Sequence, residues 1–362
     1  MNAHDPAQHL TTRYAPLLQA LEAGTLDARV ADVRIISIPG TEAPWRDTGI
    51  ALDVGDAVTI LGMGRVTLSD ELNLTMGAHT HLWRRIGSEG DAVRAPSATY
   101  THTADRSGHL YLGISPGAWT SRRGDHHGIF PLDGGFAALV IRWHADPRDG
   151  LRAVERLVPG DGPLRTELQR LEHPLAPPAG WTPLWYVGAS ALFGAATENG
   201  RPIVRTRSVD DVGIVKYPVD LPLTEATQLD WAWCVRRLPA RTAEDQLQHH
   251  DYVSIALEFE NGQDLTYYWS AALAIGTSFR CPIPWWDQRE THIVVRSGAD
   301  GLGTWQHESR GVRADYAAAV GDPPTRIVGV WLIGVSCFTH GHGHTDFADI
   351  VLRDDTTRVV VT

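Results

Sequence analysis

Apolar positions along this chain recur first with a helical period and then with the period of strands. Within residues 1–28, apolar side chains return every three or four positions ahead of a glycine stop, at Leu10, Tyr14, Leu17, Leu18 and Leu21. This spacing predicts an N-terminal helix. Residues 29–146 then show short alternating runs such as ADVRIISI and DAVTILGMGRVTL, separated by turn-forming Gly-Asp and Ser-Gly pairs. These features predict a β-sandwich domain.

The helical period returns in residues 147–180, where PRDGLRAVERL and GPLRTELQRLEH precede the Pro-rich run HPLAPPAG. We interpret this segment as a helical, Pro-rich linker. Residues 181–362 consist mainly of strand-like runs, including DWAWCVRRL, DYVSIALEFE, LTYYWSA, HIVVRSG and IVGVWLIGVSCF. The whole pattern predicts a mainly all-β protein that has two β-sandwich or jelly-roll domains, an N-terminal helix and a helical linker.

Composition narrows the classes of function. A length of 362 residues suits two domains, and 43% hydrophobic with 21% charged residues is typical of globular proteins. The formal net charge of -11 argues against nucleic acid or an anionic membrane surface as a partner. No apolar run is long enough for a membrane span, and the N-terminus lacks the basic and apolar regions of a secretion signal. We therefore expect a cytoplasmic protein.

Cysteine usage and motif content exclude further chemistries. Cys234, Cys281 and Cys337 are odd in number and widely spaced, which argues against a disulfide framework and against a Cys-rich zinc site. The sequence also lacks a Gly-x-Ser-x-Gly elbow, a P-loop and a His-Glu-x-x-His motif. Nucleotide hydrolysis and serine-hydrolase chemistry therefore rank low.

The runs WRDTGIALDVGDAVTILGMGRVTL, HLWRRIG and SGHLYLGI share a frame of a Gly-Asp turn, an apolar strand and a Ser-Gly-x-Leu-x-Leu strand. Over roughly residues 33–143 this frame resembles the galactose-binding-like sandwich of small bacterial galactophilic lectins. The resemblance implies a sandwich fold, with calcium and sugar held by the loop after the last of these strands. In the matching loop, SPGAWTSRRGDHHG, Asp125 is the candidate ligand-binding carboxylate, and the paired asparagines of those lectins are absent.

The second half carries another resemblance. The runs GWTPLWYVG, LDWAWCVRRLPA, DYVSIALEFENGQDLTYYWS, HIVVRSG and FADIVL resemble a bacterial family that is known only as a domain of unknown function. The resemblance covers most of residues 180–352. It implies a jelly-roll sandwich akin to carbohydrate-binding modules, and it implies no particular activity. Relatives are rich in Asp and Thr ahead of the last strand, where this chain has HGHGHTD.

That departure places three histidines at alternate positions, His340, His342 and His344, followed by Asp346. On an extended strand such residues share one face. Imidazole and carboxylate groups are typical ligands of zinc and other first-row ions. We therefore identify these four residues as candidate ligands of a divalent metal, with Zn, Mn, Fe or Ca as the candidate ions. The interleaved glycines leave a second interpretation, a loop in which the rings do not converge.

Histidine also occurs in smaller clusters. We interpret each of these, taken alone, as a surface or edge group: His79 with His81, Asp125 with His126 and His127, and His249 with His250 and Asp251. Together they are more numerous than composition alone explains. Metal ligation and acid–base chemistry near neutral pH are the roles in which histidine is distinctive.

Strand parity predicts a groove on the second sandwich. In DYVSIALEFE, apolar residues alternate with polar ones. If the polar faces line one concave sheet, the groove holds Glu258, Glu260, His292, Arg296, Tyr267, Trp269 and Asp349, with Trp285 and Trp286 at the rim. Aromatic rings and charged groups suit a polyhydroxylated ligand, and two carboxylates across a groove suit acid–base catalysis. The alternative is a solvated face of ion pairs.

Three functions remain open. The first is recognition of a carbohydrate or polyol through the groove of the second sandwich. The second is a hydrolase or lyase, with or without a divalent metal, whose candidate catalytic residues are His342, Glu258, Asp349, His292 and Arg296. The third is an oligomeric scaffold, a homo-oligomer that takes no small ligand.

Overall fold

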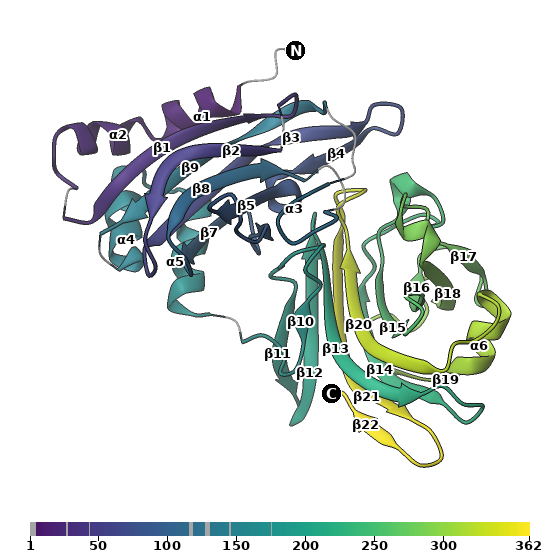
Figure 1. The fold of residues 1–362 in the computed structure, drawn as a ribbon. Coiled ribbons are helices and arrows are strands. Elements are labelled where there is room, and N and C mark those ends of the chain that lie inside the picture. The colour runs from purple at the N-terminus through teal and green to yellow at the C-terminus, as the bar shows by residue number, and fades with distance from the viewer. Residues whose placement is uncertain are drawn as a thin grey trace. The chain divides into compact units, whose positions relative to one another are not determined.

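The structure is a computed structural model that describes residues 5–26, 28–42, 44–115, 119–126, 131–144, 146–174 and 176–362. Residues 1–4 and 27 of the predicted N-terminal segment, and His127, lie outside the described residues. The chain divides into two compact units (Figure 1). The first comprises Met1–Leu175 with Trp185–Ala189, and the second comprises Ala176–Leu184 with Ser190–Thr362.

The first unit is a β-sandwich with helices packed on it. Within the described residues, one sheet has the strand order β1-β9-β3-β4, with β7 also paired to β3, and the other has the order β2-β8-β5-β6. Its strands are β1 Val30–Pro39, β2 Trp45–Leu52, β3 Ala57–Ser69, β4 Leu74–Gly77, β5 Leu82–Ile86, β6 Val93–Arg94, β7 Thr99–Thr103, β8 Gly108–Ile114 and β9 Asp133–Trp143. Its helices are α1 Pro6–Arg13, α2 Ala15–Glu22, α3 Ala78–His81, α4 Pro147–Leu157 and α5 Gly162–Glu172.

The predicted N-terminal helix forms, but it is interrupted at Tyr14 between α1 and α2. Pro16 has no backbone N–H to donate back along the chain, so the helical hydrogen bonding is broken at this point. The side chains of Leu10, Tyr14 and Leu17 are fully buried, as their spacing predicts. The Tyr14 hydroxyl donates to Asp161 Oδ2 at 2.7 Å, while Asp161 Oδ1 accepts from the backbone N–H of Leu164 and caps α5.

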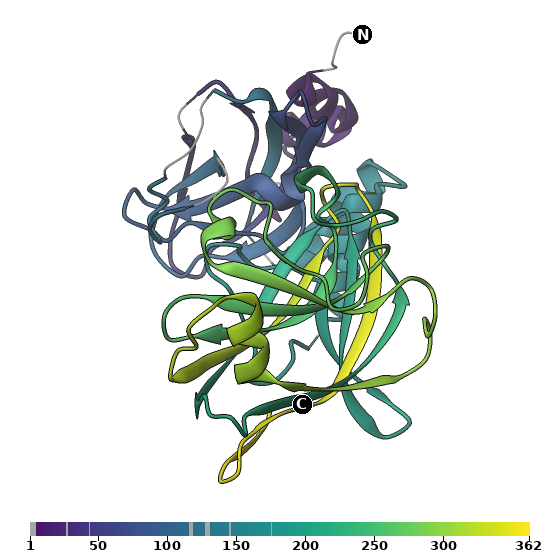
Figure 2. The same ribbon diagram turned by 90° about the vertical axis from the view of Figure 1, so that its right-hand side faces the viewer.

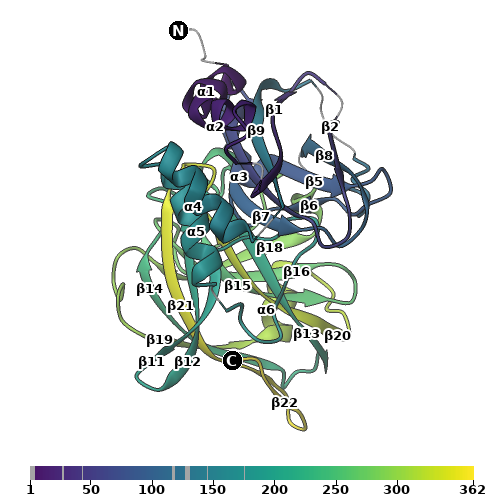
Figure 3. The ribbon, with the colours of Figure 1, turned by 90° about the vertical axis from the view of Figure 1, so that its left-hand side faces the viewer.

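The segment that we interpreted as a helical linker belongs to the first unit. Helices α4 and α5 lie side by side (Figure 3), and their apolar faces enter the core of that unit through Leu151, Val154, Leu164 and Leu168. The physical reason is hydrophobic burial, because an amphipathic helix is stabilised by covering an apolar surface. The Pro-rich residues that follow α5 connect it to the second unit.

The second unit is a sandwich of long, curved strands (Figure 2). In the described residues, one sheet has the order β10-β13-β20-β15-β16-β18-β17, and the other has the order β11-β12-β21-β14-β19, with β22 paired to β21. The strands are β10 Thr182–Pro183, β11 Phe193–Glu198, β12 Arg201–Val209, β13 Val212–Pro222, β14 Gln228–Arg237, β15 Val253–Phe259, β16 Asp264–Ser270, β17 Ser278–Arg280, β18 Glu290–Ser297, β19 Gln306–Gly311, β20 Arg326–Val335, β21 His342–Arg353 and β22 Arg358–Val360. Helix α6 spans Val312–Ala319, and two short 3-10 helices span Leu247–His249 and Trp286–Gln288.

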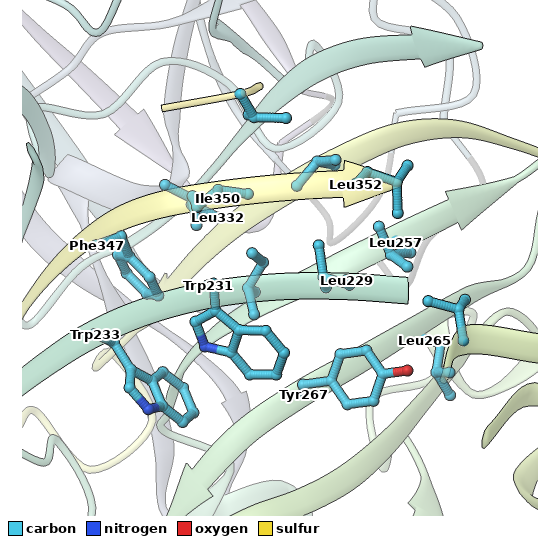
Figure 4. Close-up of a cluster of buried hydrophobic side chains, with 14 of the residues drawn as sticks. Leu229, Trp231, Trp233, Leu257, Leu265, Tyr267, Leu332, Phe347, Ile350 and Leu352 are labelled. Atoms are coloured by element: carbon cyan, nitrogen blue, oxygen red, sulfur yellow. The ribbon is translucent and has the colours of Figure 1, made fainter. Parts of the chain in front are cut away.

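The core of this unit lies between its two sheets and is rich in aromatic rings (Figure 4). The ring of Trp231 stacks on Tyr267 with centroids 5.6 Å apart, and Trp233 contacts both Trp269 and Phe347. The mainly all-β fold with two β-sandwiches is therefore confirmed. None of the helices in the described part of the chain combines the length and the apolar character needed to cross a membrane.

Candidate functional site

One sheet of the second unit has two buried faces of opposite character. On β15 the apolar residues Val253, Ile255 and Leu257 point into the core between the sheets, as parity predicts. The intervening residues point to the other face, which we call the polar face. It carries Ser254 and Glu258 on this strand. This polar face is covered by loops, so its polar groups must find partners within the protein.

The covering loop follows from strand topology. Strands β16 and β18 are parallel neighbours, whereas the other pairs in this sheet are antiparallel. A parallel pair needs a crossover connection, because the chain must return to the end at which the first strand began. Here the crossover is residues 271–289, which include the short edge strand β17. It brings Cys281, Trp285 and Trp286 onto the sheet.

The crossover and the strands beside it form a partly exposed aromatic and ionic surface, which we call the Trp285 surface. It consists of Trp285, Trp286, Lys216, Glu258 and Arg289, and it adjoins the fully buried ring of Trp331. The side chain of Trp285 is 44% exposed and meets Trp286 edge to face, with centroids 5.5 Å apart. Trp286 in turn meets Trp331 of β20 at 6.4 Å. Trp285 has a φ of 77°, a left-handed conformation that is a genuine outlier for a bulky residue.

An ionic network lies beside these rings. Glu258 Oε2 accepts from Lys216 Nζ at 2.5 Å and from the indole N–H of Trp331 at 3.1 Å. Arg289 contacts Glu258 at 3.8 Å and donates from Nε to Asp264 Oδ2 at 3.0 Å. The Arg289 guanidinium also lies 5.1 Å from the Trp331 ring and 5.5 Å from the Trp286 ring. The surface thus offers the flat rings of Trp285 and Trp286 next to oriented charges.

Further along the same face lies a group that we call the buried polar cluster, formed by His250, Tyr252, Cys281, Glu290 and His292. Each of these residues is at most 3% exposed. The Nε2 atom of His250 lies 3.4 Å from Cys281 Sγ, while its Nδ1 atom donates to the backbone carbonyl of Glu244 at 2.6 Å. Glu290 Oε1 accepts from the Tyr252 hydroxyl at 3.0 Å and lies 3.4 Å from His292 Nε2.

Burial dominates the electrostatics of the buried polar cluster. Desolvation lowers the pKa of His250 to about 4, and it lowers the pKa of His292 well below its usual range. The same loss of solvent raises the pKa of the Cys281 thiol, and it raises the pKa of Glu290. The imidazoles and the thiol are therefore neutral near pH 7. A bound cation would reverse this preference, because it stabilises a thiolate and a carboxylate.

Several predicted groove residues lie elsewhere. Tyr267 and Trp269 share a face of β16, as parity predicts, but that face is the core between the sheets, where both side chains are fully buried. Hydrophobic burial explains the difference, since both rings pack on core tryptophans. Arg296 pairs with Glu308 of β19, and Glu260 is hydrogen-bonded to Thr325. The structure places Glu258 3.8 Å from Arg289, whose guanidinium lies 5.5 Å from the Trp286 ring, and it places His292 in the buried polar cluster.

The four predicted metal ligands of the histidine-rich stretch are not brought together. His340 has a φ of 53° and bonds Asp210, so it lies outside the strand that starts at His342. His344 and Asp346 share a face of β21, with 3.9 Å between Nε2 and Oδ1. Asp346 is fully buried between Arg205 at 2.8 Å and Arg236 at 3.1 Å.

The physical reason is charge neutralisation. Two arginines from neighbouring strands satisfy the Asp346 carboxylate, which leaves it poorly suited to a cation. The remaining candidates are also engaged in local contacts. Asp349 is exposed and pairs with Arg201, and in the first unit Asp125 Oδ2 accepts from the Ser121 hydroxyl at 2.7 Å.

Sequence reasoning missed Cys281 and Glu290, and it interpreted His250 and Asp251 as surface or edge groups. Both His250 and Asp251 are fully buried. Asp251 accepts from the backbone N–H groups of Phe338 and Thr339 at 3.0 and 2.8 Å. The signal for these buried residues in the sequence was the alternation of polar residues in DLTYYWS and ETHIVVRS. This alternation indicates a second buried face on both strands. Cys281 carried no such signal, because it lies in an irregular crossover.

Comparisons with known proteins give one family and several solved structures. The N-terminal domain of EclA, a PllA-like lectin, is similar over 31% of this chain and 97% of its own, with 19% identity and a TM-score of 0.24. The xyloglucanase domain of NopAA from Sinorhizobium fredii, in complex with cellobiose, is similar over 49% of this chain and 100% of its own, with 10% identity and a TM-score of 0.28. A family 30 carbohydrate-binding module from Clostridium thermocellum is similar over 51% of this chain and 96% of its own, with 13% identity and a TM-score of 0.28.

No curated protein matches the chain. Residues 179–351 match the family described as "Protein of unknown function (DUF3047)". This range lies almost wholly within the second unit. The second half of the chain therefore resembles an uncharacterised family, as its sequence runs predict.

Proposed function

We propose that the second unit recognises a carbohydrate or a similar polyol at the Trp285 surface. The observation that carries the proposal is the side chain of Trp285, which is 44% exposed and held by a backbone with a φ of 77°. Strained backbone persists where the surrounding structure enforces it, and such sites cluster at binding and catalytic positions. An exposed indole gains free energy when an apolar ligand face covers it.

The neighbouring charges supply the polar half of recognition. Sugar hydroxyls require both donors and acceptors, and the surface offers the Glu258 carboxylate together with the Lys216 and Arg289 cations. Glu258 is oriented by Lys216 and by the indole of Trp331, so it needs little reordering to accept a hydroxyl. Stacking on Trp285 and Trp286 and hydrogen bonding to Glu258 would then act on one ligand.

The experiment is a binding screen of the full chain against neutral and acidic polysaccharides, using affinity electrophoresis followed by calorimetry of soluble oligosaccharides. We expect saturable binding by the wild type and a loss of about tenfold or more in Trp285→Ala, which corresponds to about 1.4 kcal/mol. Trp305→Ala is the matched control, because Trp305 lies elsewhere on the second unit and bonds Glu198. Equal binding by Trp285→Ala and the wild type would contradict the proposal.

A second candidate function, glycoside hydrolysis, rests on two carboxylates. Glu258 and Asp264 are direct partners across β15 and β16, and both contact Arg289. Burial raises the pKa of Asp264 well above its usual range, and the adjacent Glu290 carboxylate adds to the effect. Glycosidases act through a pair of carboxyl groups. Here Glu258 is partly exposed and Asp264 is fully buried, so Glu258 is the member of the pair that a substrate can reach. We expect Glu258→Gln to abolish any release of reducing ends while oligosaccharide binding persists at reduced affinity, because the tryptophan rings and an amide acceptor remain. Unchanged release would exclude Glu258 as a catalytic group.

A further inference from the structure

The buried polar cluster has the donor set of a transition-metal site. The ligand atoms of His250, Cys281 and Glu290 all lie within 4.8 Å of one another, and all three residues are buried. Imidazole, thiolate and carboxylate are the groups that hold zinc in proteins. The sequence alone pointed to another stretch, His340 to Asp346, and gave no reason to group these residues.

Two of the observed separations match the edges of a tetrahedral zinc site. With Zn–S near 2.3 Å and Zn–N near 2.05 Å, a tetrahedral angle places sulfur and nitrogen about 3.5 Å apart. The observed distance from His250 Nε2 to Cys281 Sγ is 3.4 Å. Nitrogen and oxygen ligands are expected about 3.4 Å apart on the same basis. The distance from His292 Nε2 to Glu290 Oε1 is 3.4 Å.

His292 supplies an independent observation. Its side chain is fully buried, and neither ring nitrogen makes a hydrogen bond. Its ring is enclosed by Phe279, which stacks on it at 4.9 Å, and by Tyr252 and His250 at 5.0 and 4.9 Å. A buried imidazole without hydrogen bonds has a free-energy cost that an additional partner would remove. His292 thus points to a ligand that completes the cluster.

The surrounding contacts are those that orient metal ligands. The Nδ1 atom of His250 donates to the Glu244 carbonyl, which fixes the tautomer that leaves Nε2 as the electron donor. Glu290 accepts from Tyr252 and from Thr266, each at 3.0 Å, which fixes the carboxylate in the same way. His250 is held by the Glu244 carbonyl and Glu290 by the hydroxyls of Tyr252 and Thr266, so little reordering is needed on binding.

We propose that His250, Cys281, Glu290 and His292 form a closed structural site for one zinc-type divalent ion. The ligands come from the segment ahead of β15, the crossover and β18. An ion there would fasten the two covering segments to the polar face. Binding ionises the thiol of Cys281, so at least one proton leaves the protein for each ion bound. The inference depends on residues other than those of the Trp285 surface, and it can fail or hold independently of the proposed carbohydrate recognition.

The test is a titration of the chelator-treated full chain with Zn(II) alone and, in parallel, with Co(II) alone. We expect about one equivalent of zinc to remain after desalting, a rise of several degrees in Tm and release of at least one proton per ion. Cobalt is expected to give the intense charge-transfer absorption of a thiolate ligand. Cys281→Ser should lose the retained zinc, while Cys234→Ser, a change at another buried cysteine, should keep it.

A second measurement keeps the test informative if Cys281→Ser fails to fold. Cobalt absorption of the wild type reports thiolate ligation without any substitution, and a triple His340→Ala, His342→Ala and His344→Ala variant should retain the ion. The proposal is overturned by an absence of stoichiometric zinc in the wild type, by cobalt absorption that lacks a thiolate band, or by loss of the ion in the triple variant alone.

Discussion

The Nε2 atom of His250 lies 3.4 Å from the Sγ atom of Cys281, and this contact joins the segment ahead of β15 to the crossover between β16 and β18. The same crossover presents Trp285 four residues later. The two features of the polar face are thus carried by one connection. A cation held at the first would restrain the backbone that orients the second.

Backbone strain at Trp285 gives a prediction that separates stability from recognition. Trp285→Gly is expected to raise the free energy of unfolding of the second unit by about 1 kcal/mol, because glycine adopts a positive φ without steric cost. The same change should abolish oligosaccharide binding, since the indole is lost. Urea unfolding and calorimetry would measure the two effects.

Trp285→Ala is the matched control, because alanine removes the ring but keeps the steric cost of a φ of 77°. It should lose binding without the gain in stability. A glycine variant that is less stable than the alanine variant would show that the conformation of Trp285 is unstrained.

Two core tryptophans should respond differently to the same substitution. The indole N–H of Trp233 donates to Glu308 Oε1 at 3.1 Å, whereas that of Trp231 is buried without a hydrogen bond. Both changes to phenylalanine leave a similar cavity, so their difference reports the hydrogen bond. We expect Trp233→Phe to cost about 1–2 kcal/mol more than Trp231→Phe in urea unfolding. Equal costs, or a larger cost for Trp231→Phe, would contradict this assignment.

The carboxylate of Asp346 is expected to be structural. Asp346→Ala would remove the carboxylate partner of Arg205 and one of the two partners of Arg236, which also pairs with Glu198, and it should lower the free energy of unfolding by about 2–3 kcal/mol. Asp349→Asn on the same strand keeps a side chain that tolerates the φ of 50° and should cost at most about 1 kcal/mol, because the side chain of Asp349 is 57% exposed and its ion pair is screened by solvent. Chemical denaturation of both variants checks the difference. A mild effect of Asp346→Ala would reopen the histidine-rich stretch as a ligand site.

The first unit should lose stability in mild acid through His102. This ring bonds the Arg84 guanidinium at 2.8 Å, and burial followed by the Arg84 charge lowers the pKa of His102 to about 4. Above pH 6.5 the ring is neutral in both the folded and the unfolded chain. Below that value the unfolded chain binds a proton that the folded chain excludes, so stability falls as the pH drops from about 6.5 to about 4.

His102→Gln should reduce this loss of stability by about 1–2 kcal/mol, because the ring is only partly buried. The rest of the slope should persist, because burial also lowers the pKa of His81 in the same unit, to about 3. The nearby Asp105 carboxylate acts in the opposite direction on His102 and leaves the net shift downward. Unfolding free energies at pH 7.5, 6 and 5 measure the slope, with the exposed His173→Gln as control. Identical slopes in the wild type and His102→Gln would contradict the assignment.

The local pattern of apolar and polar residues was sufficient to predict the fold class and the direction of many side chains. The alternation in DYVSIALEFE predicts that Val253, Ile255 and Leu257 share the core face, and they do. The spacing of Leu10, Tyr14 and Leu17 predicts one buried helical face, which also forms. These outcomes depend on periods of two and 3.6 residues, which are properties of the backbone itself.

The tertiary structure decided which residues contact one another across the fold. Parity assigns Trp269 and Glu258 each to one face of its own strand, but it does not show which of those faces packs into the core. Whether β18 would pair in parallel with β16 was also open, and that pairing is what brings Cys281 beside His250. The sequence by itself determined the two sandwiches and the period of their faces, because both follow from local sterics and hydrophobic spacing. Only the folded chain decided which polar groups meet on one face, because strand order and crossover path depend on contacts between residues far apart in the chain.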